Sequence, residues 1–280
     1  MSVTFKKITP NIGAEVITTA TGMLEDGAAE EILAGLEVYG VLVFPEIFAS
    51  DEQMVSLSNS LGEMEKAKVT ADSSQASKLG VYRVSKEDKD IAQAEYVAGN
   101  DYWHMDGTSY AIPGKATLLK CEQPPSAGGE TEFANLYAAY DALDEATKEK
   151  IDSLNVFHSM AAAMRFVNTQ PSDEDRARWH RIFPPTKQPL VWRRPNGRCS
   201  LIIGSTAESV ADMNDAEGRK LLDELLAWST GSEFTYLHNW KKGDLVIFNN
   251  PSLLHRSRPY TKDSGRALHR ATVKGSVATH

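Results

Sequence analysis

A histidine and a carboxylate stand two residues apart in the segment Trp103-His104-Met105-Asp106, and both side-chain types bind metal ions. If this segment is a strand, alternation places His104 and Asp106 on the same face. His255 lies far along the chain, in a second strand-like segment over residues 249–260. Two imidazoles and one carboxylate can hold Fe(II) on one face and leave positions open for O2 chemistry.

The same residues have a simpler interpretation, because His-x-Asp arises often by chance and can be a hydrogen-bonded pair within a strand. Arg266 favours the metal site, since it follows His255 in the next strand-like segment and alternation lets both side chains enter one cavity. A guanidinium donates two parallel hydrogen bonds to a carboxylate, as the far end of a dicarboxylate cosubstrate would require. The pattern therefore predicts a metal site with an anion site beside it.

The N-terminal part of the chain predicts two helices around a short strand. A helix is expected over 24–39, with Gly40 ending it and a buried strand over 41–47 following. Ser50 and Gln53 form a capping box that begins a second helix over 50–64.

The rest of the chain is rich in short strands, with one amphipathic helix expected over 137–154. The strands are expected at 115–122, 130–136, 189–194, 198–204, 233–240, 244–250, 252–257 and 266–275. Pro195-Asn196-Gly197 predicts a hairpin turn. Many short strands with few helices indicate a mainly β fold with surrounding helices, a double-stranded β-helix (jelly roll).

No repeat or linker divides the chain, so a single domain over 1–280 is expected. The stretch 163–186 is polar and poorly periodic, and it fits either a lid over the site or an ordinary surface excursion.

Composition restricts the partners. The net charge of -8 argues against nucleic acid and against an anionic membrane surface, which both need clustered Lys and Arg. Cys121 and Cys199 form neither a CxxC motif nor a disulfide framework, and no apolar run resembles a signal peptide or a membrane span. A cytoplasmic protein that acts on a small molecule is expected.

Two regions resemble the metal-binding halves of the taurine dioxygenase/2,4-dichlorophenoxyacetate dioxygenase (TauD/TfdA) family. The first, residues 100–143, carries Trp-His-x-Asp and then Gly-Gly-x-Thr; the second, residues 241–275, carries a distal His with an Arg 11 residues later. The resemblance extends over nearly the whole chain, and these motifs are specific in combination.

The resemblance implies an Fe(II)- and 2-oxoglutarate-dependent dioxygenase that uses O2 and releases succinate and CO2. His104, Asp106 and His255 would be the iron ligands. Thr131 would hydrogen-bond the distal carboxylate of 2-oxoglutarate, and Arg266 would form the salt bridge to it.

The resemblance also implies substrate residues. Arg270 matches the position that holds a sulfonate or carboxylate, so an anionic substrate is expected, and Asn100 matches a substrate-side position. Asn249-Asn250-Pro251 and Arg193-Arg194-Pro195 depart from the family's Asp-Asn-Arg and Arg-Thr-His-Pro. These departures spare the iron and cosubstrate positions but leave the substrate unspecified. Relatives are often dimers or tetramers, so a homo-oligomer is expected.

Other interpretations stay open for single residues and for the chemistry. Arg270 could pair with a surface carboxylate, and Asn100 could only cap a turn. The outcome could be hydroxylation, with or without C–heteroatom cleavage, or desaturation of an amino-acid-like substrate. A zinc hydrolase on the same triad gives no reason for Thr131 and Arg266, and a non-catalytic binding protein gives none for a complete ligand set.

Overall fold

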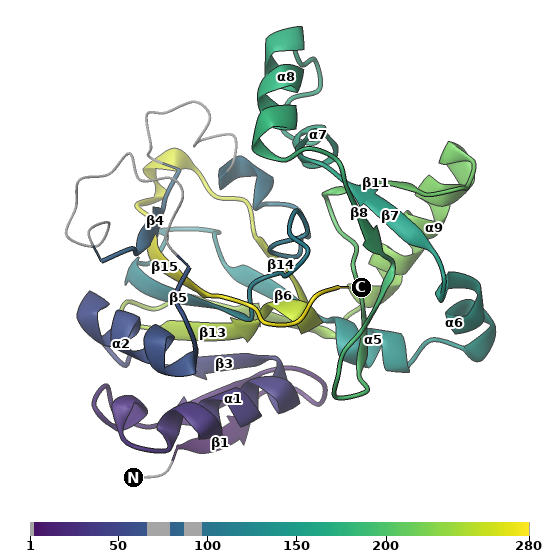
Figure 1. Cartoon of the computed structure of the whole chain (residues 1–280). Coiled ribbons are helices and arrows are strands. Elements are labelled where there is room, and N and C mark those ends of the chain that lie inside the picture. Colours follow the sequence, from purple (N-terminus) through teal and green to yellow (C-terminus); the bar gives the residue numbers. More distant parts are fainter. Residues whose placement is uncertain (1–2, 66–78, 87–96, 280) are drawn as a thin grey trace.

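A seven-stranded sheet runs through the body of the molecule (Figure 1). The computed structural model describes residues 3–65, 79–86 and 97–279. The sheet's strands, in spatial order, are β1 (Thr4–Lys7), β2 (Ala14–Ile17), β3 (Val41–Phe44), β13 (Leu245–Asn249), β5 (Ala116–Gln123), β15 (Ala267–Val273) and β4 (Tyr82–Val84). Only β2 and β3 pair in parallel among the described strands of this sheet.

A second sheet of three antiparallel strands packs against the first. Its order is β12 (Thr235–His238), β6 (Thr131–Asn135) and β14 (Leu253–Ser257). Phe133 from β6 and Phe248 from β13 meet across the interface, with ring centroids 5.2 Å apart. Leu119, Leu253 and Leu268 complete this buried cluster. The prediction of a mainly β fold is confirmed.

Strand alternation lets the seven-stranded sheet serve two cores. Leu118 and Ile247 point to the face covered by α1 (Ala28–Tyr39) and α2 (Asp51–Leu61), whereas Leu119 and Phe248, one residue on, point to the second sheet. The capping box is confirmed: the Ser50 hydroxyl accepts from the Gln53 amide at 3.2 Å, and the Ser50 amide donates to the Gln53 side chain at 2.9 Å.

The first helix begins later than expected. Residues 22–24 form a separate 3-10 turn (η1, Gly22–Leu24), and Gly27, at φ +85°, lies between that turn and α1. Gly40 ends α1 as predicted, with its amide donating to the Leu36 carbonyl at 2.9 Å.

The expected single helix over 137–154 is wrong, because two short helices occupy this stretch. They are α5 (Leu136–Asp141) and α6 (Glu145–Ile151). The Asp144 carboxylate accepts from the Thr147 amide at 2.8 Å and so begins a new helix where the apolar periodicity had suggested continuation.

The remaining elements lie between β6 and β12. They are β7 (Asn155–His158), α7 (Met160–Met164), α8 (Asp173–Ile182), β8 (Thr186–Pro189), β9 (Val191–Arg193), β10 (Cys199–Leu201), β11 (Ala207–Val210) and α9 (Asp215–Ser229). β9 and β10 pair antiparallel across Pro195-Asn196-Gly197, which confirms the predicted hairpin. The short 3-10 turns η2 (Asn250–Ser252) and η3 (Lys262–Ser264) flank β14.

One helix, α8, forms within the stretch 163–186 in which no periodicity was found, and α7 ends at the start of that stretch. A capping box between Ser172 and Asp175 begins α8, whose one buried residue is Trp179, so the helix is too polar to show an apolar stripe. Figure 1 shows α8 projecting from the body of the molecule. In the described parts of the chain, no helix has the length and apolar character needed to cross a membrane.

The connection from β5 to β6 passes very close to the connection from β14 to β15. Gly128 has φ +67°, and a Cβ atom there would lie 2.3 Å from the Pro259 carbonyl oxygen. Gly129 has φ +71°, and its Cβ would lie 2.8 Å from Cδ of Arg266. The two glycines before Thr131 are therefore needed for close approach as well as for the turn.

We predict that Gly128→Ala destabilises the protein more than Gly197→Ala. Gly197 has φ +81° but no atom within 4 Å of an added Cβ, so it tests the backbone cost alone. That cost is about 1–2 kcal/mol at either position. Gly128→Ala is expected to lose about 1–3 kcal/mol more, because backbone must move to admit the methyl group. Urea denaturation of both variants measures the difference, and equal losses would contradict it.

Candidate active site

Two paired backbone hydrogen bonds join the segment around His104 to β14. The His104 amide donates to the His255 carbonyl at 3.0 Å, and the His255 amide donates to the His104 carbonyl at 2.9 Å. The expected strand at His104 is wrong, since only this single bridge forms there. The bridge nevertheless sets the two imidazole rings 4.1 Å apart.

A glycine loop holds the other side of this segment. The Ser205 amide donates to the Trp103 carbonyl at 2.7 Å. Gly204 has φ +117°, and a Cβ there would lie 2.8 Å from that same carbonyl oxygen. His104 is thus fixed between β14 and the 204–205 loop.

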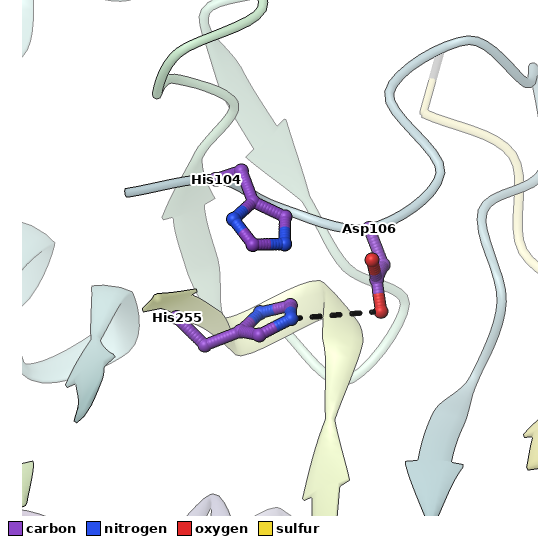
Figure 2. Close-up of side chains that lie close together, drawn as sticks. All are labelled: His104, Asp106 and His255. Atoms are coloured by element: carbon purple, nitrogen blue, oxygen red, sulfur yellow. Dashed lines mark ion pairs between the residues drawn. The ribbon is translucent and has the colours of Figure 1, made fainter. Parts of the chain in front are cut away.

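Asp106 completes the group of three metal-binding side chains (Figure 2). Its Oδ2 lies 3.9 Å from Nε2 of His255, and one ligand atom from each of the three residues falls within 4.8 Å of the others. These spacings suit a single ion bound by two nitrogens and one oxygen.

The protonation states also suit a divalent metal. Burial lowers the pKa of His104 and of His255, so both imidazoles are neutral. Nδ1 of His104 lies 2.8 Å from the Tyr102 carbonyl and must carry the ring hydrogen, which leaves the Nε2 lone pair for a metal. Burial would raise the pKa of Asp106, but the charge of Arg270 and its hydrogen bond to the carboxylate outweigh burial and hold that pKa well below its usual range.

Two further side chains orient Asp106. Its Oδ2 accepts from Nη2 of Arg270 at 2.6 Å and from the Thr117 hydroxyl at 3.1 Å. The Thr117 oxygen also lies 3.1 Å from the side-chain oxygen of Asn250, whose buried Nδ2 has no partner among the described residues. Exchanging the amide O and N resolves this, so that Asn250 donates to Thr117 and Thr117 donates to Asp106. Because Oδ2 holds these contacts, Oδ1 is available for a metal.

Six of the seven candidate residues line one cavity: Asn100, His104, Thr131, His255, Arg266 and Arg270. Leu119, Phe248 and Leu268 supply apolar wall between them. Both sheets therefore contribute to the cavity wall: His255 comes from β14 of the second sheet, and Leu268 and Arg270, which alternation places on the same face, come from β15 of the first. The backbone carbonyl of Asn100 also accepts from the Ser257 amide at 2.7 Å, so this residue closes a turn as well as lining the cavity.

Arg266 is a buried cation with only neutral oxygens around it. Its side chain donates from Nε to the Gly129 carbonyl at 2.8 Å, from Nη2 to the Thr131 hydroxyl at 3.3 Å and from Nη1 to the Tyr260 hydroxyl at 3.4 Å. The residue is 4% exposed, and no carboxylate of the described residues forms an ion pair with it. A buried guanidinium without a counter-charge is costly, so this end of the cavity fits a bound anion.

Thr117, Tyr260 and Trp240 contact candidate residues but were not singled out from the sequence, and Asn250, named there only as a departure from the family pattern, contacts Thr117. A weak signal existed for Thr117, which is a polar residue in the otherwise apolar first half of β5. Trp240 gave no signal, because its indole nitrogen reaches Thr131, at 2.9 Å, from a distant part of the chain.

A second group of metal-binding residues, Asp51, Glu122 and His269, lies between α2 and the seven-stranded sheet. Nζ of Lys120 lies 2.6 Å from a carboxylate oxygen of both Asp51 and Glu122. The Lys120 ammonium already pairs with both acids, so the group is an ion-pair network that attaches α2 to β5 and β15.

The segment after α7 contacts the residues that precede His104. The Tyr102 ring stacks on Phe166 with centroids 4.6 Å apart, and the Tyr102 hydroxyl donates to the Phe166 carbonyl at 2.9 Å. The stretch 163–186, for which a lid and an ordinary surface excursion were both open, therefore touches the loop that carries two of the candidate ligands.

Comparison with known proteins gives matches along nearly the whole chain. The sequence matches the taurine catabolism dioxygenase TauD, TfdA family over residues 4–272. It is 35% identical to an alpha-ketoglutarate-dependent 2,4-dichlorophenoxyacetate dioxygenase of Cupriavidus pinatubonensis, over 87% of each chain. It is 30% identical to a (S)-phenoxypropionate/alpha-ketoglutarate-dioxygenase of Sphingobium herbicidovorans, over 95% of this chain and 93% of the relative.

A solved structure agrees with these relatives. The crystal structure of AAD-2 in complex with Mn(II) and N-oxalylglycine superposes with a TM-score of 0.83 and 31% identity, and the match covers 99% of both chains. The chain belongs to the taurine catabolism dioxygenase TauD, TfdA family.

Proposed function

We propose that this Fe(II)- and 2-oxoglutarate-dependent dioxygenase hydroxylates a small anionic organic substrate, with His104, Asp106 and His255 as iron ligands. One observation carries the proposal. The neutral imidazoles of His104 and His255 line the same cavity as the buried guanidinium of Arg266, and the ionised carboxylate of Asp106 lies beside the two imidazoles. When bound, the iron would supply the activation of O2 that couples decarboxylation of 2-oxoglutarate to oxidation of the substrate.

The protein side chains would bind and orient the cosubstrate. Arg266 and Thr131 lie at one end of the cavity, where they would hold the distal carboxylate of 2-oxoglutarate and direct its keto acid toward the ligand residues. Leu119, Phe248 and Leu268 would keep water from the reacting end.

Charge supports an anionic substrate. Arg270 lines the same cavity and is the candidate for the substrate's carboxylate or sulfonate, and Asn100 lines that cavity too. Two relatives act, by name, on phenoxypropionate and 2,4-dichlorophenoxyacetate, which are both small carboxylates. Hydroxylation next to a heteroatom would release it by C–heteroatom cleavage. Desaturation of the substrate would use the same residues. A zinc hydrolase would need only the three metal ligands and would not explain the buried Arg266.

The proposal also covers the fold type, the domain organisation, a lid, the cellular location and the oligomeric state. The two packed sheets support a double-stranded β-helix (jelly roll) within a single domain over 1–280. The contact of Phe166 with Tyr102 supports a lid around 163–186. A cytoplasmic homo-oligomer, dimer or tetramer, remains the expectation from the sequence.

We predict that Asp106→Ala and His255→Ala each weaken Mn(II) binding by more than the roughly 10–100-fold typical of losing a residue that only supports a ligand. Isothermal titration calorimetry measures the affinity without turnover, and 2-oxoglutarate-dependent succinate release should vanish in parallel. His180→Ala, on the exposed surface of α8, is the matched control and should bind Mn(II) like the wild type. Mn(II) affinity that is unchanged in either ligand variant would refute the assignment.

We predict different defects for the two cavity arginines. Arg266→Ala should raise the Kd for 2-oxoglutarate about 30-fold or more, because a charged pair is lost at a buried site. Arg270→Ala should leave that Kd within about threefold and instead raise the KM for an anionic substrate. Anaerobic titration of the Fe(II) protein, followed by the weak visible band of the bound 2-oxo acid, gives the Kd.

A screen of small carboxylates and sulfonates for succinate release gives the KM. Because Arg270 also contacts Asp106 at 2.6 Å, Mn(II) affinity is measured in the same variant to separate a metal defect from a substrate defect. Equal losses of 2-oxoglutarate affinity in both variants would show that their roles are divided wrongly.

A further inference from the structure

The Thr131 hydroxyl is surrounded by groups that can only donate. Its oxygen accepts from Nε1 of Trp240 at 2.9 Å and from Nη2 of Arg266 at 3.3 Å. Indole and guanidinium nitrogens have no acceptor capacity, while a hydroxyl has two lone pairs and one hydrogen. Both lone pairs are therefore occupied, and Thr131 can offer only its hydrogen to a third partner.

The Tyr260 hydroxyl is placed in the same way. It accepts from Nη1 of Arg266 at 3.4 Å, which leaves its hydrogen to be donated. Two cations fix the ring: Nζ of Lys86 lies 4.2 Å from its centroid, and the Arg266 guanidinium lies 4.8 Å from it. Lys86 is itself held by Asp101 at 2.7 Å.

The donors that remain match one carboxylate. Arg266 has five guanidinium hydrogens, and its three contacts with protein oxygens leave two. These two and the hydroxyl hydrogens of Thr131 and Tyr260 make four donors, equal to the roughly four acceptor positions of a carboxylate. Arg266, Thr131 and Tyr260 all line the cavity, whereas Trp240 lies behind Thr131.

We propose that Tyr260 donates its hydroxyl hydrogen to the distal carboxylate of 2-oxoglutarate, and that Trp240 is a positioning residue that makes Thr131 a donor to the same group. This inference rests on the proposed function. The subsite then offers four donors, and its one remaining acceptor position is the second lone pair of the Tyr260 hydroxyl, so it selects an ionised carboxylate over an amide or an alcohol.

The competing explanation is structural. Tyr260 would then only shield Arg266 from water, and the Trp240 N–H would only satisfy itself on the nearest oxygen. Both explanations predict some loss of affinity on mutation. They differ in whether that loss depends on the distal carboxylate of the ligand.

The test compares two ligands on the Mn(II)-loaded protein by calorimetry: 2-oxoglutarate, and 2-oxopentanoate, which has a methyl group in place of the distal carboxylate. Tyr260→Phe should raise the Kd for 2-oxoglutarate about tenfold, the size expected for a hydrogen bond to a charged group. It should leave the Kd for 2-oxopentanoate within about twofold. Tyr39→Phe, on α1, is the control for loss of a tyrosine hydroxyl outside the cavity.

Trp240 is tested through Thr131. Trp240→Phe should raise the Kd for 2-oxoglutarate about fivefold in the presence of Thr131, but should add no more than about twofold when combined with Thr131→Val. Thermal unfolding of each variant confirms that it is folded. If Trp240→Phe does not fold, Trp240→Leu, which also lacks the indole N–H donor, replaces it in the same cycle with Thr131→Val.

The outcomes distinguish failure of the proposed cosubstrate subsite from failure of the roles proposed for Tyr260 and Trp240. If wild type binds 2-oxoglutarate no more tightly than 2-oxopentanoate, the proposed cosubstrate subsite itself is wrong. If wild type discriminates but Tyr260→Phe weakens both ligands equally, or neither, the role of Tyr260 is overturned. Additive effects of Trp240→Phe and Thr131→Val would overturn the role of Trp240.

Discussion

The candidate site depends on the two mutual backbone hydrogen bonds between His104 and His255. They join a loop to a strand that lies far away in the sequence, and without them the two imidazoles would have no fixed separation. Strand β14 is in turn paired with β6, which carries Thr131, so the candidate ligand His255 and the candidate cosubstrate contact Thr131 lie in one sheet. Such support from strands keeps a set of ligands in place before any ion arrives.

The cavity separates its charges. Arg270 is paired with Asp106, whereas Arg266 contacts neutral oxygens in the described structure. The first arrangement keeps the carboxylate ionised for a metal, and the second leaves a buried positive charge that an incoming carboxylate would neutralise. Arg266 lies immediately before β15 and Arg270 lies four residues later within it, so the different charge environments of the two arginines follow from their neighbours rather than from their residue type.

Close approach of two connections shapes the anion end. Gly128 lies against the Pro259 backbone and Gly129 against the Arg266 side chain, so the turn before Thr131 and the segment before Arg266 fix each other. A side chain at either glycine would push these segments apart. The Gly-Gly-x-Thr motif therefore has a packing reason as well as a turn reason.

The sequence by itself determined strands β3, β5, β6, β9, β10 and β12 to β15, the hairpin, the capping box at Ser50 and the types and spacing of the candidate ligands, but not the short strands β1, β2, β4, β7, β8 and β11. These features follow from local rules, namely period-two alternation, turn chemistry and end capping, that act within a few residues. The break before α6 was missed although Asp144 is a local signal, because apolar periodicity continued across it.

Only the tertiary structure decided which polar groups meet. The contacts of Trp240 with Thr131, and of Asn250 with Thr117, join residues that are distant in the sequence. So does the bridge between His104 and His255, which formed where a strand was expected. Such contacts depend on how the sheets pack and on where one segment of the chain passes another. Periodicity within a segment carries no information about either.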